Sequence, residues 1–197
     1  MGDMDEAPRG RADELGSLAG RLLVATPLMN DPNFARTAVF VAEHSEDGAL
    51  GVVLNRPSQT DVSEVLPLWD TVVTSPAVVF VGGPVSPDGA LALGRIGGSL
   101  PEAGFQPVVH GFGVVDLDGD PALLSPHLAA LRVFAGYSGW GPGQLDDEIE
   151  EGAWYVVDGA PDDVFCSRPD VLWRDVLRRQ GGDLAMVSTF PPDPSLN

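Results

Sequence analysis

The stretch from Phe134 to Trp154, FAGYSGWGPGQLDDEIEEGAW, predicts a strand, a sharp corner and a short acidic helix. Its first residues complete LRVFAGYS (131–138), an apolar run with β-branched and aromatic residues that is typical of a strand. The glycines that follow permit backbone conformations with positive φ, and the single proline suits a first helical turn. Leu145 and Ile149 then lie four residues apart on one helical face, and Gly152 predicts the end of the helix.

The same stretch does not fit two catalytic motifs that it resembles at first sight. A nucleophile elbow, GxSxG, needs a glycine two residues after Ser138, where this chain has Trp140. A dinucleotide fingerprint, GxGxxG, needs its third glycine where this chain has Asp146.

The acids Asp146, Asp147 and Glu148 fall in the early helical turns, where the helix dipole favours negative charge. A divalent metal or a basic partner is the alternative role for this run, although its carboxylates diverge around the helix.

The remaining pattern predicts a single mixed α+β domain over residues 17–190, between a disordered acidic tail (1–16) and a C-terminal tail (191–197). The clearest hairpin joins residues 37–44 to 49–55 through the turn SEDG. Further strands are expected within 20–29 and over 77–85, 89–96, 112–117 and 183–188, with 77–85 and 89–96 paired to each other. A short helix is expected after an N-cap at Asp61, with Val62, Val65 and Leu66 on its inner face. Two further helices are expected over 125–131 and 168–182.

The absence of lysine and the strongly negative net charge exclude or disfavour several classes of function. The 197 residues carry 29 acids against 11 basic residues, all of them arginine, for a net charge of −18. Without lysine the chain cannot be a Schiff-base or pyridoxal phosphate enzyme, a Ser-Lys hydrolase or a Walker-type phosphate binder. The net charge also opposes direct contact with nucleic acids, whose binding depends on clustered cations.

The chain shows no sign of a metal, a cofactor or a membrane anchor. Cys166 is the only cysteine, which excludes an internal disulfide and a CxxC module. The histidines at 44, 110 and 127 lack metal-binding spacing. No apolar run approaches the ~20 residues that span a bilayer, and the polar N-terminus is not a secretory signal, so we expect a cytoplasmic protein without membrane contact.

Four stretches together resemble one family of bacterial proteins, the YqgE/AlgH family. They are LLVATPLMNDPNF, AVFVAEHSEDGALGVVLNRP, VFVGGPV and the Phe134–Trp154 stretch, and the resemblance runs from about Leu22 to Arg179. It implies a single α+β domain with a strongly bent, partly barrel-like mixed sheet flanked by helices. The family commonly has alanine where this chain has Ser138, which argues further against a nucleophile. Some members carry the label of transcriptional regulator, but this chain shows no helix-turn-helix pattern.

Three functions are compatible with these observations. The leading hypothesis is a non-enzymatic binding or regulatory module that does not contact DNA directly, with an unidentified protein or small-molecule partner. Arginine and aromatic residues make binding anchors and glycines allow close approach, so the candidate binding residues are Asn55, Arg56, Gly82, Gly83, Tyr137, Trp140 and Gln144. A purely structural role for the same residues remains open. The alternatives are an enzyme in which Arg56 holds a small anionic metabolite beside His44 or Glu43 as base, and a transcriptional regulator.

Overall fold

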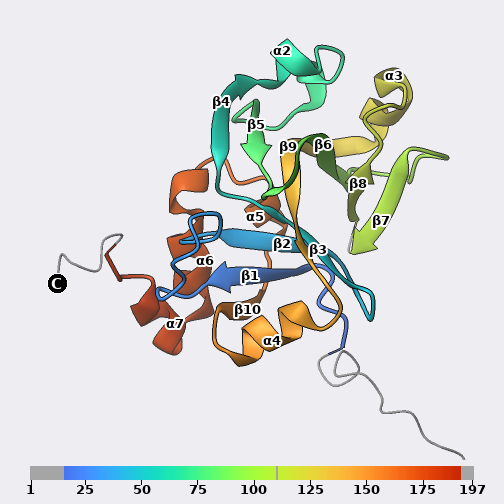
Figure 1. Cartoon of the computed structure of the whole chain (residues 1–197). Coiled ribbons are helices and arrows are strands. Elements are labelled where there is room, and N and C mark those ends of the chain that lie inside the picture. The colour runs from blue at the N-terminus through green and yellow to red at the C-terminus, as the bar shows by residue number, and fades with distance from the viewer. Residues whose placement is uncertain (1–15, 110, 192–197) are drawn as a thin grey trace, which may run out of the picture.

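The computed structural model describes residues 16–109 and 111–191, in which ten strands form one curled sheet (Figure 1). Eight of them follow the order β10-β1-β2-β3-β9-β6-β8-β7, while β4 pairs with β5 and β5 pairs with β9. The strands are β1 (Arg21–Ala25), β2 (Ala38–Ser45), β3 (Gly48–Val53), β4 (Pro57–Asp61), β5 (Val78–Val81), β6 (Val85–Ile96), β7 (Phe105–Val109), β8 (Phe112–Val115), β9 (Leu128–Trp140) and β10 (Trp154–Asp158).

Helices lie around the sheet, and most of them are short. They are α2 (Val62–Val65), α3 (Pro121–Leu124), α4 (Gln144–Glu150), α5 (Pro161–Val164), α6 (Leu172–Gln180) and α7 (Gly182–Val187), with 3-10 turns η1 (Asp70–Val72), η2 (Ser125–His127) and η3 (Pro169–Val171). In Figure 1, α6 and α7 lie on one side of the β1–β2–β3 region, and α4 lies below it. None of the helices in the described part of the chain is long and apolar enough to cross a bilayer.

Strand β9 connects the two halves of the sheet. Near its C-terminal end it pairs with β3, as in Gly51↔Ser138, and along most of its length it pairs with β6. Strand β5 joins β9 in parallel, with Phe80 opposite Phe134. Gly136 has a φ of 68° within β9, a conformation that glycine adopts without strain. The Phe134–Trp154 stretch therefore begins at the point where both halves of the sheet meet.

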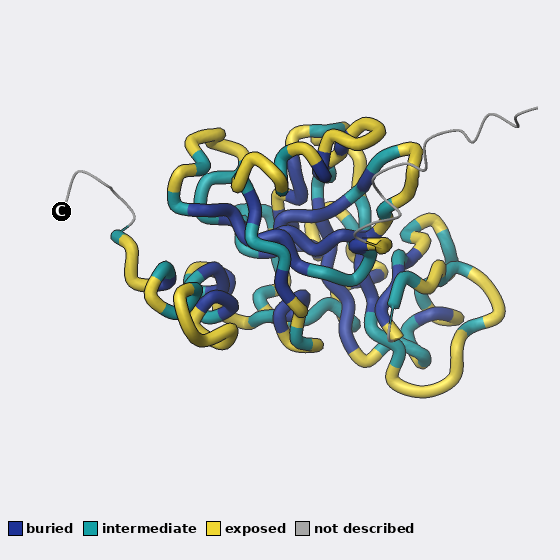
Figure 2. The backbone as a smooth tube through the Cα atoms, turned by 90° about the horizontal axis from the view of Figure 1, so that it is seen from below, coloured by how far each residue is buried: buried dark blue, intermediate teal, exposed yellow. Residues whose placement is uncertain are grey.

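Successive residues of a strand point to opposite faces of the sheet. In the β1–β2–β3 region both of these faces are covered. Leu22 and Val24 share a core cluster with Val176 of α6, whereas Leu23 and Ala25 belong to a second cluster that includes residues of α4. A third cluster, around Trp69 and Leu131, fills the other half of the sheet. Figure 2 shows this burial as a dark core of strands surrounded by exposed loops.

The structure confirms the predicted single α+β domain, and the curled half-barrel sheet agrees with what the family resemblance implies. The expected hairpin is β2–β3, with Gly48 at a φ of 130° in its turn. The strand, corner and helix of the Phe134–Trp154 stretch are β9, the residues 141–143 and α4. Both expected tails fall largely outside the described residues, as does position 110.

Four local predictions are wrong. Residues 183–188 belong mainly to helix α7 rather than a strand: Gly181 and Gly182, both at positive φ, turn the chain after α6, and Leu184 and Val187 then pack on the core at helical spacing. Residues 128–131, expected to be helical, open β9. Strand β6 does not pair with β5, because each takes a different edge of β9.

The fourth wrong prediction concerns the expected inner face of α2. Val62 is fully buried, but Val65 is 54% exposed, because α2 ends after a single turn. The side chain of Asp61 stands at the expected N-cap without making a capping hydrogen bond.

Candidate functional site

Three of the candidate binding residues line one hollow at the ends of β3 and β5. Asn55, Arg56 and Gly83 surround a space of about 270 Å³ together with Pro32, Asn33, Val53, Pro57 and Val81; we call it the Arg56 hollow. The Asn55 side chain holds this corner together, because its Oδ1 accepts from the Ala38 N–H at 3.0 Å and its Nδ2 donates to the Arg36 carbonyl at 2.9 Å. These two hydrogen bonds hold Asn55 against the backbone at this edge of the hollow.

Arg56 is half-buried and forms no ion pair with any described residue. Its Nη2 donates to the carbonyl oxygens of Ala35 at 2.9 Å and Pro32 at 3.3 Å. By contrast, carboxylate partners are found for Arg21, Arg95, Arg168, Arg178 and Arg179. The guanidinium is anchored on the loop that precedes β2, and its charge is not neutralised by a neighbouring acid of the described chain. This arrangement suits an anion, which a guanidinium binds through charge-assisted hydrogen bonds.

An apolar groove adjoins the Arg56 hollow. Its volume is about 360 Å³, and it is lined by Val79 and Val81 of β5, by Val133, Phe134 and Ala135 of β9, by Val65 and Leu66 at α2, by Ser58 and Thr60 of β4, and by residues 87–90 of β6. Val81 lines both spaces, and its N–H donates to the Arg56 carbonyl at 2.8 Å. The Arg56 hollow and the groove therefore meet at Val81, beside the Arg56 backbone.

Trp140 does not belong to this surface. It is only 6% exposed and packs with Phe34 and Trp154, at ring-centroid distances of 6.1 and 6.2 Å. Tyr137 packs half-buried against a different core cluster. The exposed Gln144 accepts from the Gly141 N–H and donates to Glu148. Tyr137, Trp140 and Gln144 do not line the Arg56 hollow, although the Tyr137 backbone lies against Gly83, which does. A binding role for these three residues stays a prediction.

Gly82 and Gly83 allow two backbones to approach each other. A Cβ on Gly82 would lie 2.3 Å from the Gly136 carbonyl oxygen, and a Cβ on Gly83 would lie 2.3 Å from the Tyr137 carbonyl. Gly82 is buried, and its carbonyl accepts the Ser138 hydroxyl at 3.1 Å. Ser138 is fully buried in β9, so its hydroxyl is not presented to a substrate.

His44 forms a buried pair that the sequence did not reveal. Its Nε2 lies 3.8 Å from Oδ2 of Asp146, and its Nδ1 accepts from the Leu18 N–H at 3.1 Å. The other carboxylate oxygen of Asp146 is buried without a hydrogen-bond partner among the described residues. No sequence spacing joins these residues, because β2 and α4 meet only in the tertiary structure. Within the described ranges, no three His, Cys, Asp or Glu side chains are grouped so as to hold a metal.

His44 and Arg56 lie at opposite ends of the β2–β3 hairpin. His44 is opposite Ala49, whereas Asn55 is bonded to Ala38, six residues back along β2. At about 3.3 Å per strand residue, this separation is roughly 20 Å. The exposed Glu43 stands beside His44 and lines a shallow hollow with Trp140 at the same end of the hairpin. Neither base lies within reach of a small anion held at Arg56.

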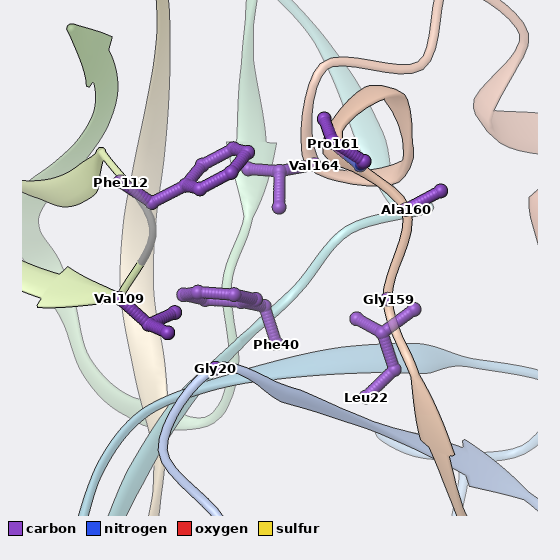
Figure 3. Close-up of a pocket in the computed structure, with 9 residues that line it drawn as sticks. All are labelled: Gly20, Leu22, Phe40, Val109, Phe112, Gly159, Ala160, Pro161 and Val164. Carbon is purple, nitrogen blue, oxygen red and sulfur yellow. The ribbon is translucent and has the colours of Figure 1, made fainter.

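A fourth space has no polar side chain among the described residues of its wall. It encloses about 190 Å³ between β1, β2, the β7–β8 hairpin and α5, and Figure 3 shows Phe40, Val109, Phe112 and Val164 around it. The remaining lining residues are Gly20, Leu22, Gly159, Ala160 and Pro161. We call it the phenyl-lined hollow. These residues offer no group for acid–base or nucleophilic chemistry.

Arg132 is a buried cation that connects β9 to the α5 segment and to the loop before β5. Its guanidinium donates to the carbonyl oxygens of Val164, Ser75 and Cys166 at 2.9, 3.1 and 3.0 Å, and it lies 4.3 Å from the Phe80 ring centroid. Burial lowers the pKa of Arg132 to about 10, although negative charge at Cys166 opposes this effect. With no opening to solvent, this arginine serves packing rather than ligand binding.

Comparisons with known proteins agree with this architecture. The profile of the family described as AlgH-like matches residues 22–185. A UPF0301 protein of Streptomyces coelicolor is 55% identical over 188 residues, covering 93% of this chain and 97% of the relative. One from Thermobifida fusca is 52% identical over 195 residues, covering 92% and 96%.

Two solved structures share the fold. A crystal structure of a Corynebacterium diphtheriae protein has a TM-score of 0.83 at 33% identity, and the match covers 95% of each chain. The solution structure of AlgH from Pseudomonas aeruginosa has a TM-score of 0.65 at 26% identity, and the match covers 96% of this chain and 98% of AlgH. The chain therefore belongs to the AlgH-like family, as the four sequence stretches predicted.

Proposed function

We propose that this chain is a non-enzymatic binding module that recognises an anionic group of its partner at the Arg56 hollow. One observation carries the proposal: Arg56 has no carboxylate partner among the described residues and lines a hollow at the surface. In a chain with 29 acids, five of the other described arginines pair with a carboxylate, whereas Arg36, Arg132 and Arg174 donate to backbone carbonyls. Arg56 combines the lack of a carboxylate partner with a position on the hollow. A cation left unneutralised in such a chain is the natural position for a ligand's negative charge.

The hydrogen bonds that restrain the Arg56 side chain support a role in binding, since a freely moving surface arginine would lose more entropy on contact with a ligand. Two backbone carbonyls hold its Nη2, so less side-chain entropy is lost when a ligand binds. Asn55 fixes the adjoining backbone in the same way. The hollow is preorganised for a ligand.

The alternatives have less support. The enzymatic alternative needs a base beside the anion, but His44 and Glu43 lie at the other end of the hairpin. For a regulator that contacts DNA directly, the net charge of −18 is unfavourable, and a lone arginine cannot form the basic surface that a phosphate backbone requires. A regulatory role through a protein or small-molecule partner remains within the proposal.

The test is a titration with acetate and inorganic phosphate, followed by the backbone amide signals in NMR spectra. Saturable shifts are expected at Asn33, Val81 and Gly83, and Arg56→Gln should weaken binding about 10- to 100-fold, as expected for the loss of a charged hydrogen bond. The matched control is Arg168→Gln, because Arg168 is exposed and pairs with Asp175. Arg56→Lys keeps the charge and should retain part of the affinity.

Two results would contradict the proposal. One is the absence of saturable shifts around the hollow in folded protein, and the other is equal anion affinity for Arg56→Gln and the unaltered chain. Thermal unfolding of each variant separates a loss of binding from a loss of folding, since Arg56 also bonds to the carbonyls of Pro32 and Ala35.

A further inference from the structure

We infer that the ligand is a small monocarboxylate with an extended apolar body, whose head group binds Arg56 and whose body lies in the apolar groove. The inference rests on the proposed function, since it uses Arg56 as the anion-binding group. It adds the chemical class of the rest of the ligand.

The first step is that the Arg56 hollow and the groove adjoin at Val81. The Val81 N–H donates to the Arg56 carbonyl, so the two residues are neighbours across β5 and the chain leading into β4. Val81 also lines both the Arg56 hollow and the groove. A ligand whose carboxylate reaches Arg56 thus has its next atoms over Val81, at the entrance to the groove.

The second step is the chemistry of the groove. Val79, Val81, Val133 and Ala135 supply its apolar surface from alternate positions of β5 and β9. Val81 is 48% exposed, and Val65, which lines the groove from α2, is 54% exposed. These side chains leave apolar surface in contact with water, which an apolar ligand would displace favourably. The volume of about 360 Å³ falls within the usual size of small-molecule sites, about 300–1,000 Å³.

The third step concerns the charge of the ligand. The planar guanidinium of Arg56 matches the geometry of a carboxylate. Among the described residues that line the groove, Asp88 on its β6 side is the only charged one. A second negative charge on the ligand would meet repulsion from Asp88 and from the strongly acidic chain as a whole. One carboxylate at one end of an uncharged body fits the surface best.

The test compares ligands that differ in only one part. Octanoate has both the head and the body, acetate has only the head, and octan-1-ol has the body without the charge. Octanoate is expected to bind at least 10-fold more tightly than either, measured by calorimetry below its aggregation concentration. In NMR spectra, octanoate should shift the amides of Val79 and Val133 as well as Gly83, whereas acetate should shift only those around the Arg56 hollow.

Two variants with exposed side chains test the groove separately from the head group. Val65→Asp places a charge on the groove wall and should weaken octanoate binding at least fivefold without changing acetate binding. Leu68→Asp is the matched control, because Leu68 is 74% exposed in the same segment but does not line the groove. It should change neither affinity.

The outcomes distinguish this inference from the proposed function. If acetate and octanoate bind equally and both need Arg56, the inference is overturned and the proposed function stands. If octan-1-ol binds as tightly as octanoate, or if Arg56→Gln binds octanoate unchanged, the octanoate carboxylate does not bind Arg56 and the inference is overturned. The proposed function fails only if Arg56→Gln also binds acetate unchanged. If Val65→Asp leaves octanoate binding intact, the body does not lie in the groove and the inference is overturned.

Discussion

The indole N–H of Trp140 donates to Oε2 of Glu148 at 2.9 Å. Trp154 donates to the same oxygen at 2.8 Å, and the amide of Gln144 donates to Oε1 at 2.9 Å. A single carboxylate from the acidic helix α4 thus satisfies two indole groups that pack against each other. Of the candidate binding residues in this stretch, Trp140 is thereby held in the core.

Replacement of Glu148 by alanine should destabilise the fold by about 2–4 kcal/mol, because two indole N–H groups lose a charged acceptor. Urea unfolding followed by tryptophan fluorescence measures the change. Glu151→Ala is the control, since Glu151 is exposed at the end of the same helix. Equal stability of the two variants would contradict the role assigned to Glu148.

Gly83→Ala should cost about 1–3 kcal/mol or more, because Gly83 has a φ of 154° and its added Cβ would lie 2.3 Å from the Tyr137 backbone. Thermal unfolding by circular dichroism checks this prediction. Gly98→Ala provides the comparison: no atom of the described chain lies within 4 Å of the place that its Cβ would take, so its midpoint should hardly change. A tolerated Gly83→Ala would mean that β5 and β9 can separate at little cost.

Arg132→Met should cost at least about 3 kcal/mol, because three carbonyl oxygens lose their donor in a buried site. Folding lowers the pKa of Arg132 to about 10, so the unfolded chain binds more protons only between pH 10 and the ordinary arginine value. In that window the group's contribution to stability rises with pH, and below it the contribution is constant. The loss measured by urea unfolding should therefore be equal at pH 6 and pH 9, and a strong pH dependence would contradict this assignment.

Val164→Ile should stabilise the protein by about 1 kcal/mol, because the added methyl group would enter the phenyl-lined hollow between Phe40 and Phe112 (Figure 3). Thermal unfolding compares it with Val65→Ile, the same change at an exposed position in α2. If both substitutions act alike, the hollow is not filled by the new side chain.

The elements that the sequence predicted correctly are those with strong local signals. The β2–β3 hairpin has alternating β-rich runs around a glycine turn, and α6 has an apolar face that ends at Gly181. The strand prediction for residues 183–188 was wrong, because a six-residue run is too short to distinguish the two-residue period of a strand from the 3.6-residue period of a helix. Strand β10 was missed, since its partner β1 lies more than a hundred residues away in the chain.

The candidate site was predicted only in part for the same reason. Asn55 and Arg56 lie just after β3, and Gly82 and Gly83 directly follow β5. The two pairs meet because β3 and β5 end at the same place in the fold. A tryptophan such as Trp140 suits a binding surface and a hydrophobic core equally well, so its residue type does not tell the two roles apart. Its partners Glu148 and Trp154 are local, but Phe34 comes from a loop far away, and that contact fixes its burial.

The sequence by itself determined the family, the mixed α+β class, the strand-to-helix corner and the absence of lysine chemistry, because composition and local patterns carry these properties. The tertiary structure alone decided which side chains meet. It placed Trp140 in the core, separated His44 from Arg56 along the hairpin, and brought Val81 to both the cation and the groove. Strand pairing through β9 joins segments that are distant in the chain, and no local pattern specifies which strands pair.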